Sequence, residues 1–131
     1  MLITYIVVLF YVTPFVEWSL HRYFHQPPRL EFHRIHHMNY HNNKSVVEYW
    51  PIPVMGFFYY YGYFLIFLGF LKYWIYHNMI HQAPALMPNL SKHHILHHKY
   101  PKYNFAVSST LPDRVMGTFL NRDPSEKVVK I

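Results

Sequence analysis

The sequence predicts an all-α integral membrane protein, with one spanning helix, a short re-entrant hairpin and a histidine-rich helical cap on the cytosolic side. Three observations predict this class. The chain of 131 residues is 52% hydrophobic and only 14% charged, whereas a soluble domain of average composition carries about 25% charged residues. Its apolar residues concentrate in two blocks, and all 12 histidines lie in the polar stretches that follow those blocks. The length fits a single domain, residues 1–131.

The first apolar block, residues 2–16, contains no charge, and its apolar character continues to Leu20 past Glu17. A helix needs about 20 predominantly apolar residues to span a bilayer, so this block is just long enough. A cleaved signal peptide is not expected, because the segment lacks a basic start and a small-residue cleavage site. Lysine and arginine follow the block but do not precede it, which predicts that its C-terminal end faces the cytoplasm.

The second apolar block, residues 51–76, is long for one span and short for two, and Lys72 is its only charge. Histidines lie on both sides of it, so a shared site requires the chain to enter and leave on one membrane face. Half of the block, as a helix that rises about 1.5 Å per residue, is shorter than the ~30 Å hydrocarbon core. We therefore predict a re-entrant hairpin that turns near Gly62. The alternative is one tilted span, which would divide the histidines between the two faces.

The formal net charge of +6 does not by itself indicate nucleic acid. Nucleic-acid-binding proteins cluster lysine and arginine on one face, whereas here these residues are scattered over the polar stretches. Such scatter is typical of segments beside an anionic cytoplasmic leaflet, so we expect a membrane and no nucleic acid as partner. The chain has no cysteine, which excludes disulfides and thiolate metal ligands.

Ten histidines fall into four spaced boxes, two of the form HxxxH and two of the form HxxHH, in alternating order. They are His21 and His25; His33, His36 and His37; His77 and His81; and His94, His97 and His98. Residues three and four apart share one face of a helix, with Cβ atoms ~5–6 Å apart, so each box can converge on a metal. Ten imidazoles exceed what one tetrahedral ion needs, which predicts two ions. Imidazole suits zinc, copper, iron and nickel alike.

His41 and His93 fall outside the four boxes. Each is interpreted either as a residue that supports the metal ligands from behind or as an ordinary polar residue. The tyrosine-rich run at residues 57–64, FFYYYGYF, is typical of membrane interfaces and helix packing. An apolar substrate channel is the alternative for this run.

The order of the boxes resembles that of the fatty acid hydroxylase superfamily, which includes sterol desaturases, fatty acid 2-hydroxylases and carotenoid hydroxylases. EWSLHRYFH at residues 17–25 resembles the first box of the family, and FHRIHH at residues 32–37 resembles the second. HHILHHKYPKYNFAVSSTLPDRVMGTF at residues 93–119 resembles the last box and the tail that follows it. The resemblance covers about residues 17–119. It implies that the ten histidines of the boxes are the metal ligands of a membrane di-iron enzyme.

The resemblance further implies an oxidoreductase of lipid metabolism, a monooxygenase that uses O2 and two electrons from a cytochrome b5-like or ferredoxin-like donor. Its two iron ions would face the cytoplasm, at the endoplasmic reticulum if the source is eukaryotic. Purified protein can also contain zinc, because histidine sites accept it readily. The tail SSTLPDRVMGTF favours hydroxylation of a fatty-acyl or sphingolipid substrate. A sterol or lipid desaturase and a carotenoid hydroxylase are the alternatives within the family.

Two features depart from the family pattern. Four spanning helices are usual, whereas this chain has room for one span and a short hairpin. That difference implies either a minimal member or one that oligomerises to complete its membrane wall. In addition, Leu111-Pro112 precedes Asp113 where an aromatic residue is more usual.

Two alternatives come from other functional classes. A non-catalytic zinc-binding membrane protein, either a metal store or a degenerate scaffold, would also use clustered histidines, but all ten histidines of the boxes are intact. A di-zinc hydrolase usually combines histidines with carboxylates that act as a base on bound water. With 6 acidic residues in the whole chain, the hydrolase is the weaker alternative.

Overall fold

The computed structural model describes residues 1–28 and 30–126 and contains helices but no strand among them. Residue 29 and residues 127–131, which belong to the predicted single domain, lie outside the described residues. The elements in chain order are α1 (Leu2–Val7), the π-helical turn η1 (Val8–Val12), α2 (Thr13–Phe24), α3 (Glu31–His41), α4 (Pro51–Tyr60), α5 (Phe64–Gln82), the 3₁₀ turn η2 (Pro84–Leu86), α6 (Pro88–Lys99) and α7 (Leu111–Met116). The predicted all-α class is confirmed for this part of the chain.

The N-terminal helix runs continuously through α1, η1 and α2, from Leu2 to Phe24. Its 23 residues make it the one helix among the described residues that is long and apolar enough to cross a membrane. The wider π turn precedes Pro14, which has no N–H to donate and a ring that crowds the preceding turn. The Leu9 carbonyl is instead bonded by the Thr13 hydroxyl at 2.6 Å and by the Lys72 ammonium of α5.

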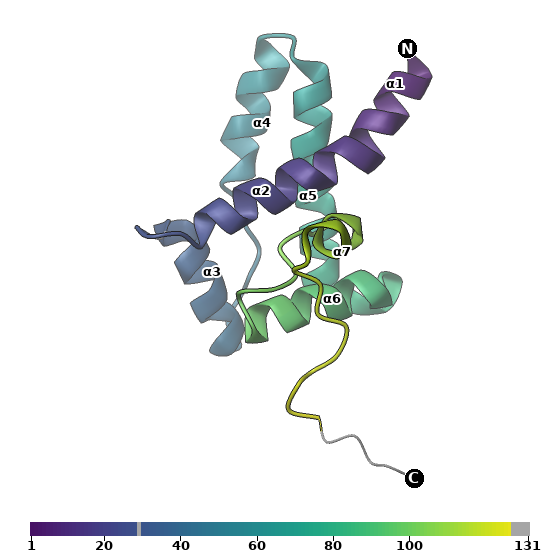
Figure 1. Cartoon of the computed structure of the whole chain (residues 1–131). Coiled ribbons are helices and arrows are strands. Elements are labelled where there is room, and N and C mark those ends of the chain that lie inside the picture. Colours follow the sequence, from purple (N-terminus) through teal and green to yellow (C-terminus); the bar gives the residue numbers. More distant parts are fainter. Residues whose placement is uncertain (29, 127–131) are drawn as a thin grey trace.

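The second apolar block folds into the antiparallel pair α4 and α5, which turns where Gly62 adopts a positive φ of 78° (Figure 1). Glycine adopts this left-handed conformation without the Cβ penalty of other residues. Phe58 stacks on Phe70 across the pair, with ring centroids 5.8 Å apart. The chain thus reverses near Gly62, as the sequence predicts, instead of continuing as one tilted helix. Entry of this hairpin into a bilayer stays a prediction.

The histidine-bearing parts of the chain lie at one end of the molecule (Figure 1). The turn of the hairpin and the N terminus lie at the opposite end from α3 and α6. In α5, which continues without a break to Gln82, the histidines occupy the end that is remote from the turn. The tyrosines at the turn are exposed, with Tyr60 81% accessible. The predicted helical cap is therefore present, and its cytosolic orientation stays a prediction.

The interior of the described residues is unusually polar. Few large apolar side chains are buried, and Trp18, Phe105 and Ala106 form a cluster of buried apolar residues. Histidines fill most of the remaining interior, with His94, His97 and His98 completely inaccessible. Buried polar groups are costly unless they are hydrogen-bonded or coordinate a metal. This interior therefore has the composition of a ligand site and not of an ordinary hydrophobic core.

Candidate metal centre

Each histidine box lies on a different helix, and all four helices direct their histidines to one place. The first HxxxH is at the end of α2, the first HxxHH is on α3, the second HxxxH is at the end of α5, and the second HxxHH is on α6. Spacings of three and four residues place the members of each box on one helix face. The predicted helical presentation of the boxes is thus observed, with His25 as the residue that caps the C-terminal end of α2.

Five histidines form the first group, and their nearest ring nitrogens all lie within 4.8 Å of one another. The first group consists of His21, His25, His33, His37 and His97. The Nε2 atom of His33 lies 3.0 Å from that of His21 and 2.8 Å from that of His25. The His25 Nε2 atom lies 3.0 Å from His97 Nε2, which brings α6 into the same group.

Four histidines form the second group, which meets the same 4.8 Å limit, and His98 adjoins it. The second group consists of His36, His77, His81 and His94. The His94 Nε2 atom lies 3.0 Å from both His77 Nε2 and His81 Nε2. His98 Nε2 lies 3.1 Å from both His36 Nε2 and His94 Nε2, so His98 completes a second set of five.

Both HxxHH boxes divide their histidines between the two groups. On α3, the pair spaced by four, His33 and His37, joins the first group, and His36 joins the second. On α6 the arrangement is reversed, because His97 joins the first group while His94 and His98 lie in the second. The two groups therefore have matching compositions, each with one HxxxH pair, one pair from an HxxHH box and one single histidine.

The spacing of the nitrogens fits metal coordination. A metal–imidazole distance of about 2.0–2.1 Å separates two ligands by about 2.9 Å at a right angle and by about 3.3 Å at the tetrahedral angle. The closest Nε2–Nε2 distances in the two groups run from 2.8 Å to 3.3 Å. Nitrogens held this close, with no carboxylate among them, form a donor set that can hold two ions.

Burial and mutual repulsion keep these imidazoles neutral. Burial, followed by the proximity of His81, lowers the pKa of His36 to about 3. Burial and the neighbouring His25 lower the pKa of His37 to about 3. The same causes depress the pKa of His94, with His98 as its strongest neighbour. Because metal ions bind the neutral ring, the site is in its metal-binding protonation state at pH 7.

Backbone carbonyls after α6 orient two histidines of the first group. The Phe105 carbonyl lies 2.5 Å from His21 Nδ1, and the Tyr103 carbonyl lies 2.7 Å from His97 Nδ1. A carbonyl can only accept, so each ring carries its proton on Nδ1 and directs the lone pair of Nε2 into the group. These two contacts carry no sequence signal, because they use main-chain atoms.

A buried carboxylate, Glu48, takes the corresponding place behind the second group. It lies between α3 and α4, with Oε1 3.4 Å from His36 Nδ1 and Oε2 3.5 Å from His77 Nδ1. Burial raises the pKa of Glu48 to about 7. Glu48 was not predicted from the sequence, although an isolated acid just before an apolar block is a signal that could have indicated it. Glu31 near the second box is exposed and pairs with Arg34 at 2.5 Å.

His93 and His41 lie outside both groups. His93 is buried, and its Nε2 atom lies 3.0 Å from Oδ2 of Asp113. The Asp113 carboxylate also accepts hydrogen bonds from the backbone N–H groups of Phe105 and Ala106, at 2.8 Å and 2.9 Å. His93 and Asp113 thus fix the loop whose carbonyl contacts His21. His41 is exposed at the end of α3.

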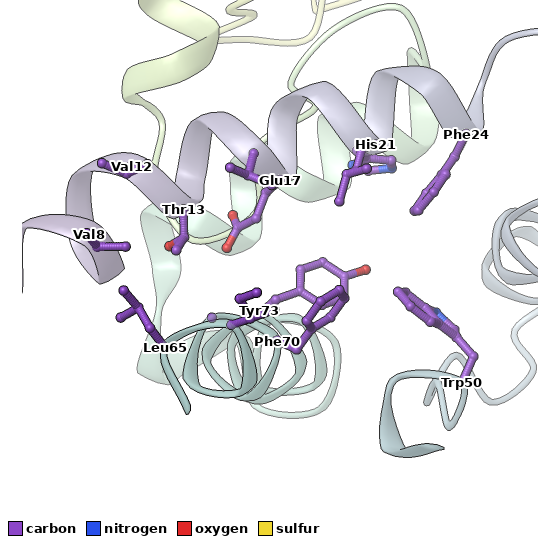
Figure 2. Close-up of a pocket in the computed structure, with 14 residues that line it drawn as sticks. Val8, Val12, Thr13, Glu17, His21, Phe24, Trp50, Leu65, Phe70 and Tyr73 are labelled. Atoms are coloured by element: carbon purple, nitrogen blue, oxygen red, sulfur yellow. The ribbon is translucent and has the colours of Figure 1, made fainter. Parts of the chain in front are cut away.

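An apolar cavity of about 260 Å³ lies between α2 and α5, beside the first group (Figure 2). Val8, Val12 and Phe24 line it from one side, and Leu65 and Phe70 line it from the other. His21 is the one histidine of the boxes that borders it. No residue of the tyrosine-rich run at 57–64 lines this cavity, so the cavity does not support the interpretation of that run as a substrate channel.

Comparison with known proteins yields one family match. The family model described as fatty acid hydroxylase matches residues 6–118. This range includes all ten histidines of the boxes, Glu48 and Asp113. Comparisons with curated proteins and with solved structures give no match.

Proposed function

The chain belongs to the fatty acid hydroxylase family, and we propose that it is a membrane di-iron oxygenase that hydroxylates a C–H bond of a lipid with O2 and two electrons. The observation that carries this proposal is the convergence of four histidine boxes into two groups of matching composition. Two groups of this kind suit two ions better than one. Membership of a family of lipid oxidoreductases gives those ions a reaction.

In this proposal all ten histidines of the boxes are ligands, five for each ion. The first group holds one ion, and the second group with His98 holds the other. When bound, two iron ions would supply the activation of O2 that the oxidation of an unactivated C–H bond requires. Zinc fits the same nitrogens, so the choice of iron rests on the family.

The polypeptide contributes water exclusion and orientation. His94, His97 and His98 have no accessible surface, and a site that excludes water protects reactive chemistry from side reactions. The apolar cavity would hold the hydrocarbon part of the substrate, with its reacting carbon at the His21 end. Because the α2 wall of the cavity belongs to the candidate membrane helix, a lipid can reach it from the bilayer.

A fatty-acyl or sphingolipid substrate is the form of the proposal that we favour. The cavity is bordered mostly by aliphatic and aromatic side chains, and its polar groups include His21, Glu17, Thr13 and the Tyr73 hydroxyl. A hydrocarbon chain matches such a lining. Exposed Lys44, Lys92 and Lys102 beside the histidines support an acidic electron donor of the cytochrome b5 or ferredoxin type, on the cytosolic face of the endoplasmic reticulum if the source is eukaryotic.

Lipid profiling of an expression host tests this function. We expect a new hydroxylated lipid in cells that express the protein, absent from cells that express His36→Ala. The matched control is His41→Ala, which removes an exposed histidine outside both groups and should leave the product in place. A desaturated product would move the assignment to the desaturase alternative. The oxygenase assignment fails if anaerobically purified protein without iron is the only form obtained and is inert with donor, reductase and O2.

A further inference from the structure

We propose that Glu48 is a positioning residue for one of the two metal ions, and that its carboxylate holds His36 and His77 by their Nδ1 atoms. The inference rests on the proposed function, because it assigns a role toward the ion of the second group. It goes beyond that function in predicting that the two ions have chemically different surroundings. The first group is supported by neutral carbonyls, and the second is supported by a carboxylate.

The geometry places Glu48 behind two rings that come from different helices. Its Oε1 atom lies 3.4 Å from His36 Nδ1 on α3, and its Oε2 atom lies 3.5 Å from His77 Nδ1 on α5. On the far side of each ring, Nε2 faces the group, 3.1 Å from His98 Nε2 for His36 and 3.0 Å from His94 Nε2 for His77. Glu48 therefore does not contact the ions but lies where it can orient two of their ligands.

The carboxylate is itself held in place. The Trp50 indole N–H donates to Oε2 at 3.0 Å, and the Tyr73 hydroxyl donates to the same atom at 3.3 Å. The Trp74 indole N–H donates to the Glu48 backbone carbonyl at 2.7 Å. Within the described residues neither Glu48 Oε1 nor His36 Nδ1 makes a close hydrogen bond. The two atoms lie 3.4 Å apart, and the Val46 backbone is the other polar neighbour of the His36 ring.

A carboxylate suits this position for a chemical reason. Its two oxygens both accept, so one side chain can accept a hydrogen bond from each of two rings. That contact fixes each ring with its proton on Nδ1, and it makes Nε2 a stronger donor to a metal. Glutamine has only one accepting oxygen, and its NH2 group would oppose an Nδ1–H. Replacement of Glu48 by glutamine keeps the shape but removes at least one of the two contacts.

Two variants separate positioning from simple anchoring of the loop between α3 and α4. Glu48→Gln alters the carboxylate and leaves the backbone carbonyl that Trp74 binds. Trp74→Phe removes that anchoring hydrogen bond and leaves the carboxylate with its contacts to the histidines. If Glu48 only anchored the loop, the two variants would affect metal binding alike.

The experiment is a Co²⁺ titration of the metal-free full chain in detergent, followed by visible absorption and by competition with a chelator. The wild type should bind two ions. Glu48→Gln should bind one of them about 10–100-fold more weakly, with an altered absorption band for that ion and an unchanged affinity for the other. Trp74→Phe should bind both as the wild type does. If Glu48→Gln yields no folded protein, Glu48→Asp takes its place. Aspartate keeps the charge but has a shorter side chain, so this variant should lower the affinity for the same ion.

Three results would overturn the positioning role. One is unchanged binding of both ions by Glu48→Gln, or by Glu48→Asp where that variant takes its place. The second is an equal loss of affinity for both ions, which indicates a general loss of structure. The third is the same loss in Trp74→Phe, which indicates anchoring alone. A wild type that binds fewer than two ions is a different failure, because it contradicts the proposed function itself.

Discussion

The Nε2 atoms of His36 and His98 lie 3.1 Å apart, although the two residues are 62 positions apart in the chain. This contact joins the two HxxHH boxes, one on α3 and the other on α6. Two imidazole nitrogens at this distance repel each other's lone pairs unless a proton or a metal ion lies between them.

His98→Ala should lower the affinity for one of the two metal ions by at least tenfold. His98 Nε2 lies within 3.3 Å of the Nε2 atoms of His36, His81 and His94. Its removal therefore deprives the second group of a ligand. Loss of a direct ligand should lower metal affinity at least as much as loss of a residue that supports a ligand. Metal content after dialysis, measured against His41→Ala, checks this. Equal metal retention in the two variants would contradict the assignment of His98.

Asp113→Asn should destabilise the protein by about 1–3 kcal/mol, which is the usual cost of leaving buried donors unsatisfied. Asp113 is completely buried and accepts from Phe105 N–H, Ala106 N–H and the Thr118 hydroxyl. Thermal unfolding in detergent measures the effect. Glu31→Gln is the control, because the exposed Glu31 pairs with Arg34 at the surface and loss of its charge should change the unfolding temperature little.

The same Asp113→Asn variant should lower the metal affinity of the first group more than that of the second group. Asp113 fixes the backbone of Phe105, whose carbonyl holds His21 Nδ1 at 2.5 Å. Co²⁺ titration resolves the two ions. A loss confined to the second group would contradict this connection.

The metal-free protein should lose stability as the pH falls below about 6.5. The pKa of His36 and the pKa of His37 are both held near 3 in the folded state, whereas an unfolded histidine titrates near 6.5. Between these values the unfolded chain binds more protons, so stability falls with decreasing pH, by up to about 1.4 kcal/mol per pH unit for each such histidine. Above pH 6.5 both states are neutral at these positions, and this contribution vanishes.

Unfolding temperatures of chelator-treated protein between pH 7.5 and pH 5 measure this dependence. A double variant, His36→Gln with His37→Gln, should show a shallower decline, because it removes two of the responsible groups. An unchanged unfolding temperature across this range would show that the imidazoles are not buried as described.

Gly69→Leu should reduce lipid oxidation at least tenfold while both ions stay bound. Gly69 lines the apolar cavity, and a Cβ added there already contacts Thr13 Cγ2 at 3.4 Å, so a leucine side chain fills space that the substrate needs. Gly56→Leu is the matched control, because a Cβ at Gly56 meets nothing within 4 Å and Gly56 does not line the cavity. Equal product yields from the two variants would remove the cavity from the substrate path.

The grouping of histidines within each box was predictable because the information for it is local. Residues spaced by three and four lie on one face of a helix in any fold. Once helices are assumed, the histidines of each box are therefore expected to point in one direction. The turn near Gly62 was also predictable, because the histidines on both sides of the apolar block had to share a site. The division of the histidines between the two groups was not predictable, since His36 and His37 are adjacent in sequence yet belong to different groups.

The supporting contacts lay beyond sequence analysis for a different reason. Phe105 and Tyr103 act through main-chain carbonyls, whose position depends on the path of a loop and not on residue type. Glu48 reaches its histidines only because α3 and α5 pack on either side of its loop. His93, left open between two interpretations, supports the loop through Asp113 and contacts neither group directly.

The metal content of protein produced with ample iron and purified without oxygen tests the central claim most directly. Elemental analysis against protein concentration should give two iron ions per chain for the wild type and for His41→Ala, and a loss of iron for His36→Ala. A wild-type content of one ion or none, or two sites that take up zinc and exclude iron when both are offered, would contradict a di-iron centre.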